Sequence, residues 1–126
     1  MLQDGEALLI DMDTLCQGHP VFELASMFNA YCGFSELDHS VSAHFLGVPH
    51  SLSVVIWEKA LPKYLGTDDE DYIAAVKDKA MLIGYTRLMR RLIRRNGLES
   101  EQGRKEIECY KNHIIDLLQK VDTLVF

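Results

Sequence analysis

The sequence has few cysteines, no excess of positive charge and no long apolar run, and each shortage excludes a class of protein. Its three cysteines are too few and too scattered for a disulfide framework, which favours a reducing compartment. A net charge of −6 argues against general binding to nucleic acid or anionic membranes, which requires an excess of lysine and arginine. No uninterrupted apolar stretch approaches the ~18 residues of a membrane span. We therefore expect a cytoplasmic protein that binds neither nucleic acid nor membrane.

The composition that remains is typical of a globular protein. Of its 126 residues, 48% are hydrophobic and 25% are charged, which suits a single domain over residues 1–126. The Asp4-Gly5 dipeptide predicts a hairpin turn, because both residues tolerate positive φ. A strand is expected from Leu8 to Met12, but only three residues precede the turn to pair with it. The open edge of that strand predicts a homodimer through the N-terminal segment.

The chain after Pro20 is predicted to be helical almost throughout. A short helix with apolar residues on all sides, and therefore deeply buried, should end near Gly33. Four more helices are expected over these ranges: Ser35 to about Phe45, Ser51 to Leu65, Thr67 to Arg95, and Ser100 to Thr123. Their expected caps are Ser35, a Thr67–Glu70 capping box, and a left-handed stop at Asn96-Gly97. The expected fold class is mainly α, with a short N-terminal β-hairpin followed by a helical bundle.

Apolar periodicity predicts which helix faces are buried. For the helix from Ser51 to Leu65, the residues with helical spacing are Leu52, Val55, Ile56, Lys59 and Ala60. Pro62 should kink or shorten its last turn. For the final helix, the predicted stripe is Ile107, Tyr110, Ile114, Leu117, Leu118 and Val121.

Two carboxylates, Asp11 and Asp13, stand at the end of the predicted strand and alternate so that both point to the same face. Mg²⁺ takes oxygen ligands and keeps several waters, so one or two carboxylates plus phosphates suffice to hold it. Gly18 and Pro20 then mark a turn and a helix start. Such a pair alone is more often a solvated strand end, but this order of features favours a magnesium ion carrying phosphates.

This order of residues resembles the aminoglycoside phosphotransferase and choline kinase family, the small-molecule branch of the protein-kinase-like fold. In that family an Ile-Asp-x-(Asp/Glu) strand end is followed by Gly-x-Pro and an Asp-Leu-Ala helix. The matching residues here are Ile10, Asp11, Asp13, Gly18, Pro20, Leu24 and Ala25, with Glu23 where the family usually has Asp.

The resemblance implies a helical bundle like the C-terminal lobe of these kinases. It also implies that Asp11 binds Mg²⁺ and through it the phosphates of ATP or GTP, with Asp13 assisting. Glu23 would brace the catalytic loop, and Gly18 and Pro20 would support the site. The substrate implied for the complete protein is a small molecule that accepts phosphate on a hydroxyl.

The sequence lacks the other parts of a kinase. It contains no glycine-rich phosphate loop, no lysine on an early strand, and no His-x-Asp followed by Asn. In the family these parts lie upstream of the position that Asp11 occupies. We therefore expect a C-terminal-lobe fragment, without the N-terminal lobe and catalytic loop, that does not catalyse alone. The alternative is a helical interaction or oligomerisation module with no chemistry.

A lesser alternative is a phosphatase of the haloacid dehalogenase type. The residues from Asp11 to Leu15 resemble its Asp-x-Asp-x-Thr-Leu signature, but one residue is missing before Thr14. The deletion would misplace the hydroxyl, and too few later strands are expected for a doubly wound sheet.

Three further groups of residues carry weaker signals. Cys109 and His113 are one helical turn apart, but two residues do not make a zinc site, so a structural role is favoured. Aromatic residues at Trp57, Tyr64 and Tyr72 could line a pocket, although such residues are more often core. A basic stripe, which could hold an anion or an acidic partner but is more often a solvated face, comprises Arg87, Arg90, Arg91, Arg94 and Arg95.

Overall fold

The computed structural model describes residues 2–3, 5–7 and 17–126, and within these ranges the chain is mainly α-helical, as predicted. Two short strands, β1 (Leu2–Gln3) and β2 (Glu6–Ala7), pair antiparallel. The predicted strand from Leu8 to Met12 lies outside the described residues. The helices are α1 (Val21–Tyr31), η1 (Gly33–Ser35), α2 (Ser40–Leu46), α3 (His50–Leu65), α4 (Glu70–Arg94), η2 (Gly97–Glu99) and α5 (Glu101–Leu118), where η marks a 3₁₀ helix.

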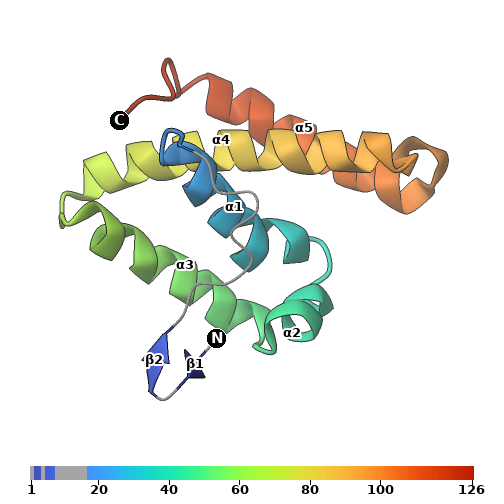
Figure 1. The fold of residues 1–126 in the computed structure, drawn as a ribbon. Coiled ribbons are helices and arrows are strands. Elements are labelled where there is room, and N and C mark those ends of the chain that lie inside the picture. Colours follow the sequence, from blue (N-terminus) through green and yellow to red (C-terminus); the bar gives the residue numbers. More distant parts are fainter. Residues whose placement is uncertain (1, 4, 8–16) are drawn as a thin grey trace.

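The long helix α4 is the centre of the arrangement (Figure 1). Helix α5 runs back along it, while α1 crosses it and lies between α4 and α3. Asn96, at φ 58°, provides the predicted left-handed stop after α4. Ser100 then caps α5, because its hydroxyl accepts a hydrogen bond from the Gly103 N–H at 3.0 Å. The turn between these helices thus sets α5 antiparallel to α4.

The crossing of α1 over α4 depends on a small residue. A Cβ at Gly84 would lie 2.5 Å from Cδ1 of Phe28, so only glycine allows this approach. The Asn29 side-chain amide donates to the Gly84 carbonyl at 3.2 Å. Phe28 packs against Tyr85 and Trp57, with ring centroids 5.1 and 5.9 Å apart. These contacts form the middle of a core that comprises Leu24, Phe28, Trp57, Leu61, Val76, Ala80, Leu82, Tyr85, Leu88, Tyr110 and Leu117.

The prediction that the first helix is buried on all sides is wrong. Val21, Leu24 and Phe28 are buried, but Phe22 is 46% exposed and Glu23 is also exposed. The reason is that α1 packs mainly against α4, α3 and η1, and the side that carries Phe22 and Glu23 is open to solvent.

The predicted buried face of α3 is also wrong. Leu52 and Val55 are 45% and 44% exposed, whereas Ser53 and Trp57 are 0% and 1% exposed. The buried row starts at a polar residue because the Ser53 hydroxyl donates to the Tyr31 carbonyl at 2.6 Å, which satisfies it inside the core. The helix continues through Pro62 to its end, so the expected shortening does not occur.

Several predicted helix ends are displaced. Ser35 caps no α-helix, because it ends η1, and α2 begins only at Ser40. Helix α4 is capped by Asp69 and not by the predicted capping box at Thr67, because the Asp69 carboxylate accepts the Tyr72 N–H at 3.1 Å. At the other end of the chain, α5 stops at Leu118, which is 57% exposed and not part of the buried stripe.

No helix in the described part of the chain is long and apolar enough to cross a membrane.

Candidate functional site

The carboxylate pair predicted to bind magnesium, Asp11 and Asp13, lies outside the described residues. The residues that follow it in the motif stand at the start of α1. Pro20 immediately precedes that helix, and the Nδ1 atom of His19 accepts the Val21 N–H at 3.2 Å. Gly18 is exposed and has a φ that any residue adopts, and a Cβ there would meet nothing within 4 Å among the described residues.

Glu23 is exposed in the first turn of α1, where its negative charge favours the positive end of the helix dipole. In the described part of the chain it has neither an ion-pair partner nor a side-chain hydrogen bond. Its predicted bracing role therefore stays a prediction.

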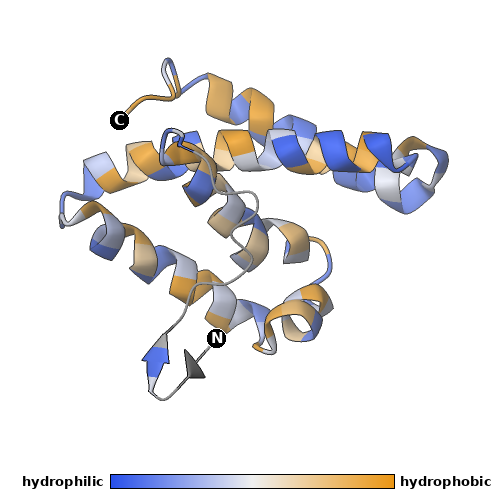
Figure 2. Cartoon of the chain, in the orientation of Figure 1, coloured by the Kyte–Doolittle hydropathy of each residue, from blue (hydrophilic) through white to orange (hydrophobic). Residues whose placement is uncertain are grey.

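The five arginines of the basic stripe, four on the exposed side of α4 and Arg95 directly after its end, line one shallow hollow. This half of the helix is largely hydrophilic (Figure 2). Arg87 donates to the Phe22 carbonyl at 3.0 Å, and the Arg91 guanidinium lies 4.8 Å from the centre of the Phe34 ring. None of the five forms a salt bridge with a carboxylate of the described residues, including the nearby acidic residues Glu99, Glu101 and Glu106.

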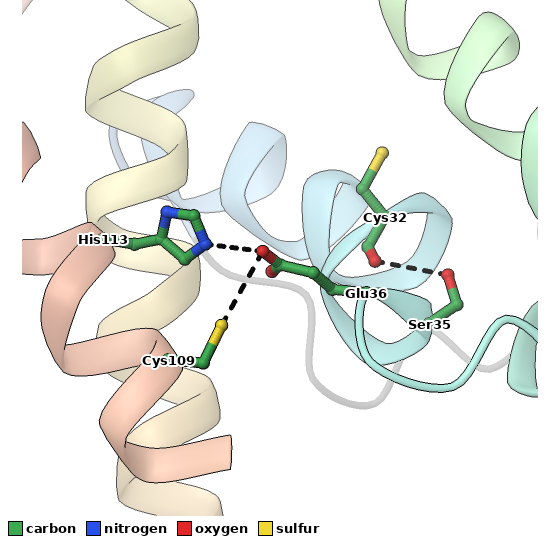
Figure 3. A network of polar contacts seen from close by, with 5 residues as sticks. All are labelled: Cys32, Ser35, Glu36, Cys109 and His113. Carbon is green, nitrogen blue, oxygen red and sulfur yellow. Dashed lines mark hydrogen bonds and ion pairs between the residues drawn. The ribbon is translucent and has the colours of Figure 1, made fainter. Parts of the chain in front are cut away.

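The structure adds a third residue to the Cys109–His113 pair. The Glu36 carboxylate oxygen Oε1 lies 2.5 Å from Nε2 of His113 and 3.9 Å from the Cys109 sulfur (Figure 3). The three candidate ligand atoms all lie within 4.8 Å of one another. We call Glu36, Cys109 and His113 the triad.

Different elements bring the triad together. Cys109 and His113 are one turn apart on α5 and point to the same side, as i and i+4 residues do. Glu36 directly follows η1, whose last residue Ser35 is 1% exposed and is held by His50 through a 2.7 Å hydrogen bond. The loop that carries the carboxylate is thus anchored to α3.

The surroundings of the triad restrict its side chains. The His113 ring stacks on the buried Tyr85 ring, with centroids 4.4 Å apart and planes 9° from parallel. Burial, and then the nearby Glu36 carboxylate, raise the pKa of Cys109, and the same two causes raise the pKa of Tyr85. The second oxygen of Glu36, Oε2, is buried without a hydrogen-bond partner among the described residues. The triad therefore has an oriented histidine, a protonated thiol and a carboxylate with unused acceptor capacity.

A cavity of about 200 Å³ lies beside Glu36, and its lining includes Cys32, Trp57 and Tyr85. Burial, and then the Glu58 carboxylate, raise the pKa of Cys32 to about 11. In Figure 3 the Cys32 thiol points away from the triad. Neither Tyr64 nor Tyr72 lines this cavity, and both are exposed, so the predicted aromatic pocket is not formed there.

Comparison with protein-family models, with characterised proteins and with solved structures finds no match for this chain. The assignment of function therefore rests on the chain's own residues. Among these, Glu36 is the one that sequence reasoning missed, because it lies 73 and 77 residues from its two partners and has no motif around it.

Proposed function

We propose that this chain is the C-terminal-lobe part of a small-molecule phosphotransferase, in which Asp11 and Asp13 bind Mg²⁺ that carries the phosphates of ATP or GTP. The observation that carries the proposal is the motif from Ile10 to Ala25, with two alternating carboxylates, Gly-x-Pro and a helix. In such a site the pair supplies oxygen ligands, and the metal neutralises charge on the phosphates during transfer to a hydroxyl.

The anchoring of α1 supports the proposal. Leu24 and Ala25 of the motif are 3% and 0% exposed, so the helix that follows Gly18 and Pro20 is fixed in the core. A metal site is held more accurately when it adjoins a rigid element. Glu23 lies in the first turn of the same helix and follows Asp13 closely in sequence. We therefore give it the role of bracing a loop that contacts the metal site.

The proposal assigns no catalysis to these 126 residues alone, because the phosphate loop, the lysine and the catalytic base have no counterpart in the sequence. For the isolated chain we expect no phosphate transfer and only weak binding of Mg²⁺ and nucleotide. Tight binding in a calorimetric titration would contradict this part of the proposal.

The direct test uses the longest uninterrupted reading frame that contains this chain. Transfer of labelled phosphate from ATP or GTP to a panel of small hydroxyl compounds is measured for wild type, Asp11→Ala and Asp4→Ala. Asp4 is the matched control, since it is a carboxylate in the same segment but outside the motif. We expect Asp11→Ala to abolish transfer and Asp4→Ala to retain it, with both variants folded by circular dichroism. Retained activity in Asp11→Ala would refute the assignment.

A helical interaction module, with a second copy of the chain as partner, is the second candidate function. The outward face of α3 favours it, because Leu52 and Val55 are 45% and 44% exposed and form a groove with Ile56 and Ala60. Apolar groups clustered in this way mark contact surfaces more often than isolated ones do. Light scattering at increasing concentration tests it: Val55→Asp should lower the average mass if α3 associates, and a monomeric wild-type chain would exclude it.

A further inference from the structure

We propose that Glu36, Cys109 and His113 form a binding site for a zinc ion. This site uses no residue of the Asp11–Asp13 pair and does not rest on the proposed phosphotransferase function. The three side chains supply one oxygen, one sulfur and one nitrogen ligand, which is a donor set that zinc accepts.

The distances fit a tetrahedral ion after small side-chain movements. Zinc bonds of ~2.3 Å to sulfur and ~2.0–2.2 Å to nitrogen and oxygen place the ligand atoms about 3.3–3.6 Å apart. The Cys109 sulfur and Glu36 Oε1 are 3.9 Å apart, and every pair of the three ligand atoms lies within 4.8 Å. The His113–Glu36 hydrogen bond would open as the ion enters between Nε2 and the carboxylate. Changes of about 1 Å lie within the reach of side-chain torsions.

The packing around the site already limits the histidine. Its ring stacks on Tyr85, which is 3% exposed and therefore fixed in the core. Cys109 and His113 share one face of a regular helix, so their spacing is set by the backbone. Preorganised ligands lose less conformational freedom on binding, which favours affinity.

An ion pair between Glu36 and His113 would be the simplest other explanation. Such a pair accounts for one carboxylate oxygen but leaves the buried Oε2 atom of Glu36 without a hydrogen bond to the part of the chain that the structure describes. The Cys109 thiol donates a hydrogen bond to Oε1 at 3.9 Å, so a thiol and an imidazole converge on one carboxylate oxygen. A zinc ion would use the unused acceptor capacity of this carboxylate, and the Cys109 thiol would release its proton to solvent and bind the ion as a thiolate.

Three protein ligands leave the fourth tetrahedral position to water, as in zinc sites that perform chemistry. Glu36 also lines the neighbouring cavity of about 200 Å³. The site therefore has room for exchange of that water next to one of its ligands.

The test is a cobalt titration of the chain with Cys16→Ser and Cys32→Ser, in which Cys109 is the one remaining cysteine. Co²⁺ replaces zinc and reports thiolate binding through a sulfur-to-cobalt charge-transfer band. We expect this band together with the intense visible bands of tetrahedral cobalt, and displacement of both by zinc. Addition of Cys109→Ser should remove the charge-transfer band.

The other ligands are tested by Glu36→Gln and His113→Gln, each of which should weaken cobalt binding by at least about tenfold. Glu108→Gln is the matched control, because Glu108 lies next to Cys109 on α5 but is exposed and paired with Lys111. Circular dichroism establishes that each variant is folded. Absence of the charge-transfer band in the Cys109-only chain, or equal cobalt affinity in Glu36→Gln and Glu108→Gln, would overturn the proposal.

Discussion

Replacement of Gly84 by alanine tests the contact on which the fold depends, the crossing of α1 over α4. The added Cβ would lie 2.5 Å from Cδ1 of Phe28 and 2.8 Å from Oδ1 of Asn29. Both neighbours are buried, and Phe28 is held by Trp57 and Tyr85, so the ring cannot turn away without disturbing the core. The helix axes must therefore move apart to admit the methyl group.

The change in the free energy of unfolding is the sum of two destabilising effects and one stabilising effect. Overpacking of a core costs about 1–3 kcal/mol, and a clash of this severity lies at the upper end. Distortion of the hydrogen bond from Asn29 to the Gly84 carbonyl adds about 1 kcal/mol. Alanine in place of glycine inside a helix returns about 1 kcal/mol. We expect a net loss of about 3 kcal/mol in the free energy of unfolding, or about 10 °C in Tm for a domain of this size.

The assay is urea denaturation followed by far-UV circular dichroism, with Gly18→Ala as the control. A Cβ at Gly18 meets nothing within 4 Å among the described residues, so its replacement should change stability by less than about 0.5 kcal/mol. If Gly84→Ala were as stable as wild type or more so, helix propensity would outweigh the clash. The close packing of α1 on α4 would then be refuted.

The remaining predictions concern reactivity and charge. With Cys32 as the one remaining cysteine, alkylation near pH 8 should be about 100-fold slower in the folded chain than in urea, because burial raises its pKa from 9.0 to about 11 and depletes the thiolate. Equal alkylation rates in the folded chain and in urea would contradict this prediction. The same pKa shift favours the folded state below about pH 9, and this contribution to the free energy of unfolding should be lost as the pH rises towards 11. Arg90→Glu should raise stability by about 0.5–1 kcal/mol at low salt, because it replaces repulsion from Arg87 and Arg94 with attraction. Thermal denaturation measures this gain, which should shrink in high salt. A loss of stability in Arg90→Glu would contradict the prediction, because it would show that Arg90 makes a stabilising contact.

The sequence predicts the helical class and several helix ends because these depend on local signals. Asn96 adopts the left-handed conformation that ends α4, as its residue type predicts. The displaced start of α4 also has a local cause, since Asp69 and Thr67 are both competent caps. The carboxylate of Asp69 takes the helix N–H, while the Thr67 hydroxyl accepts the N–H of Asp69 itself.

Tertiary contacts decide the features that the sequence does not predict. On α3, the rows through Leu52 and through Ser53 both have helical spacing, and hydrophobicity favours the first. The second row is buried because the Tyr31 carbonyl satisfies the Ser53 hydroxyl and because Trp57 meets Phe28. The triad depends in the same way on the packing of the Glu36 loop against α5, which no local pattern encodes.

The Mg²⁺ dependence of phosphate transfer tests the central claim, that Asp11 and Asp13 hold the metal of a phosphotransferase. In the uninterrupted reading frame, the rate is measured against free Mg²⁺ for wild type, Asp13→Asn and Asp4→Asn. We expect Asp13→Asn to need at least about tenfold more Mg²⁺ for half-maximal rate, since it removes one charged oxygen ligand. Asp4→Asn should match wild type. Transfer with the same Mg²⁺ dependence in all three proteins would contradict the account.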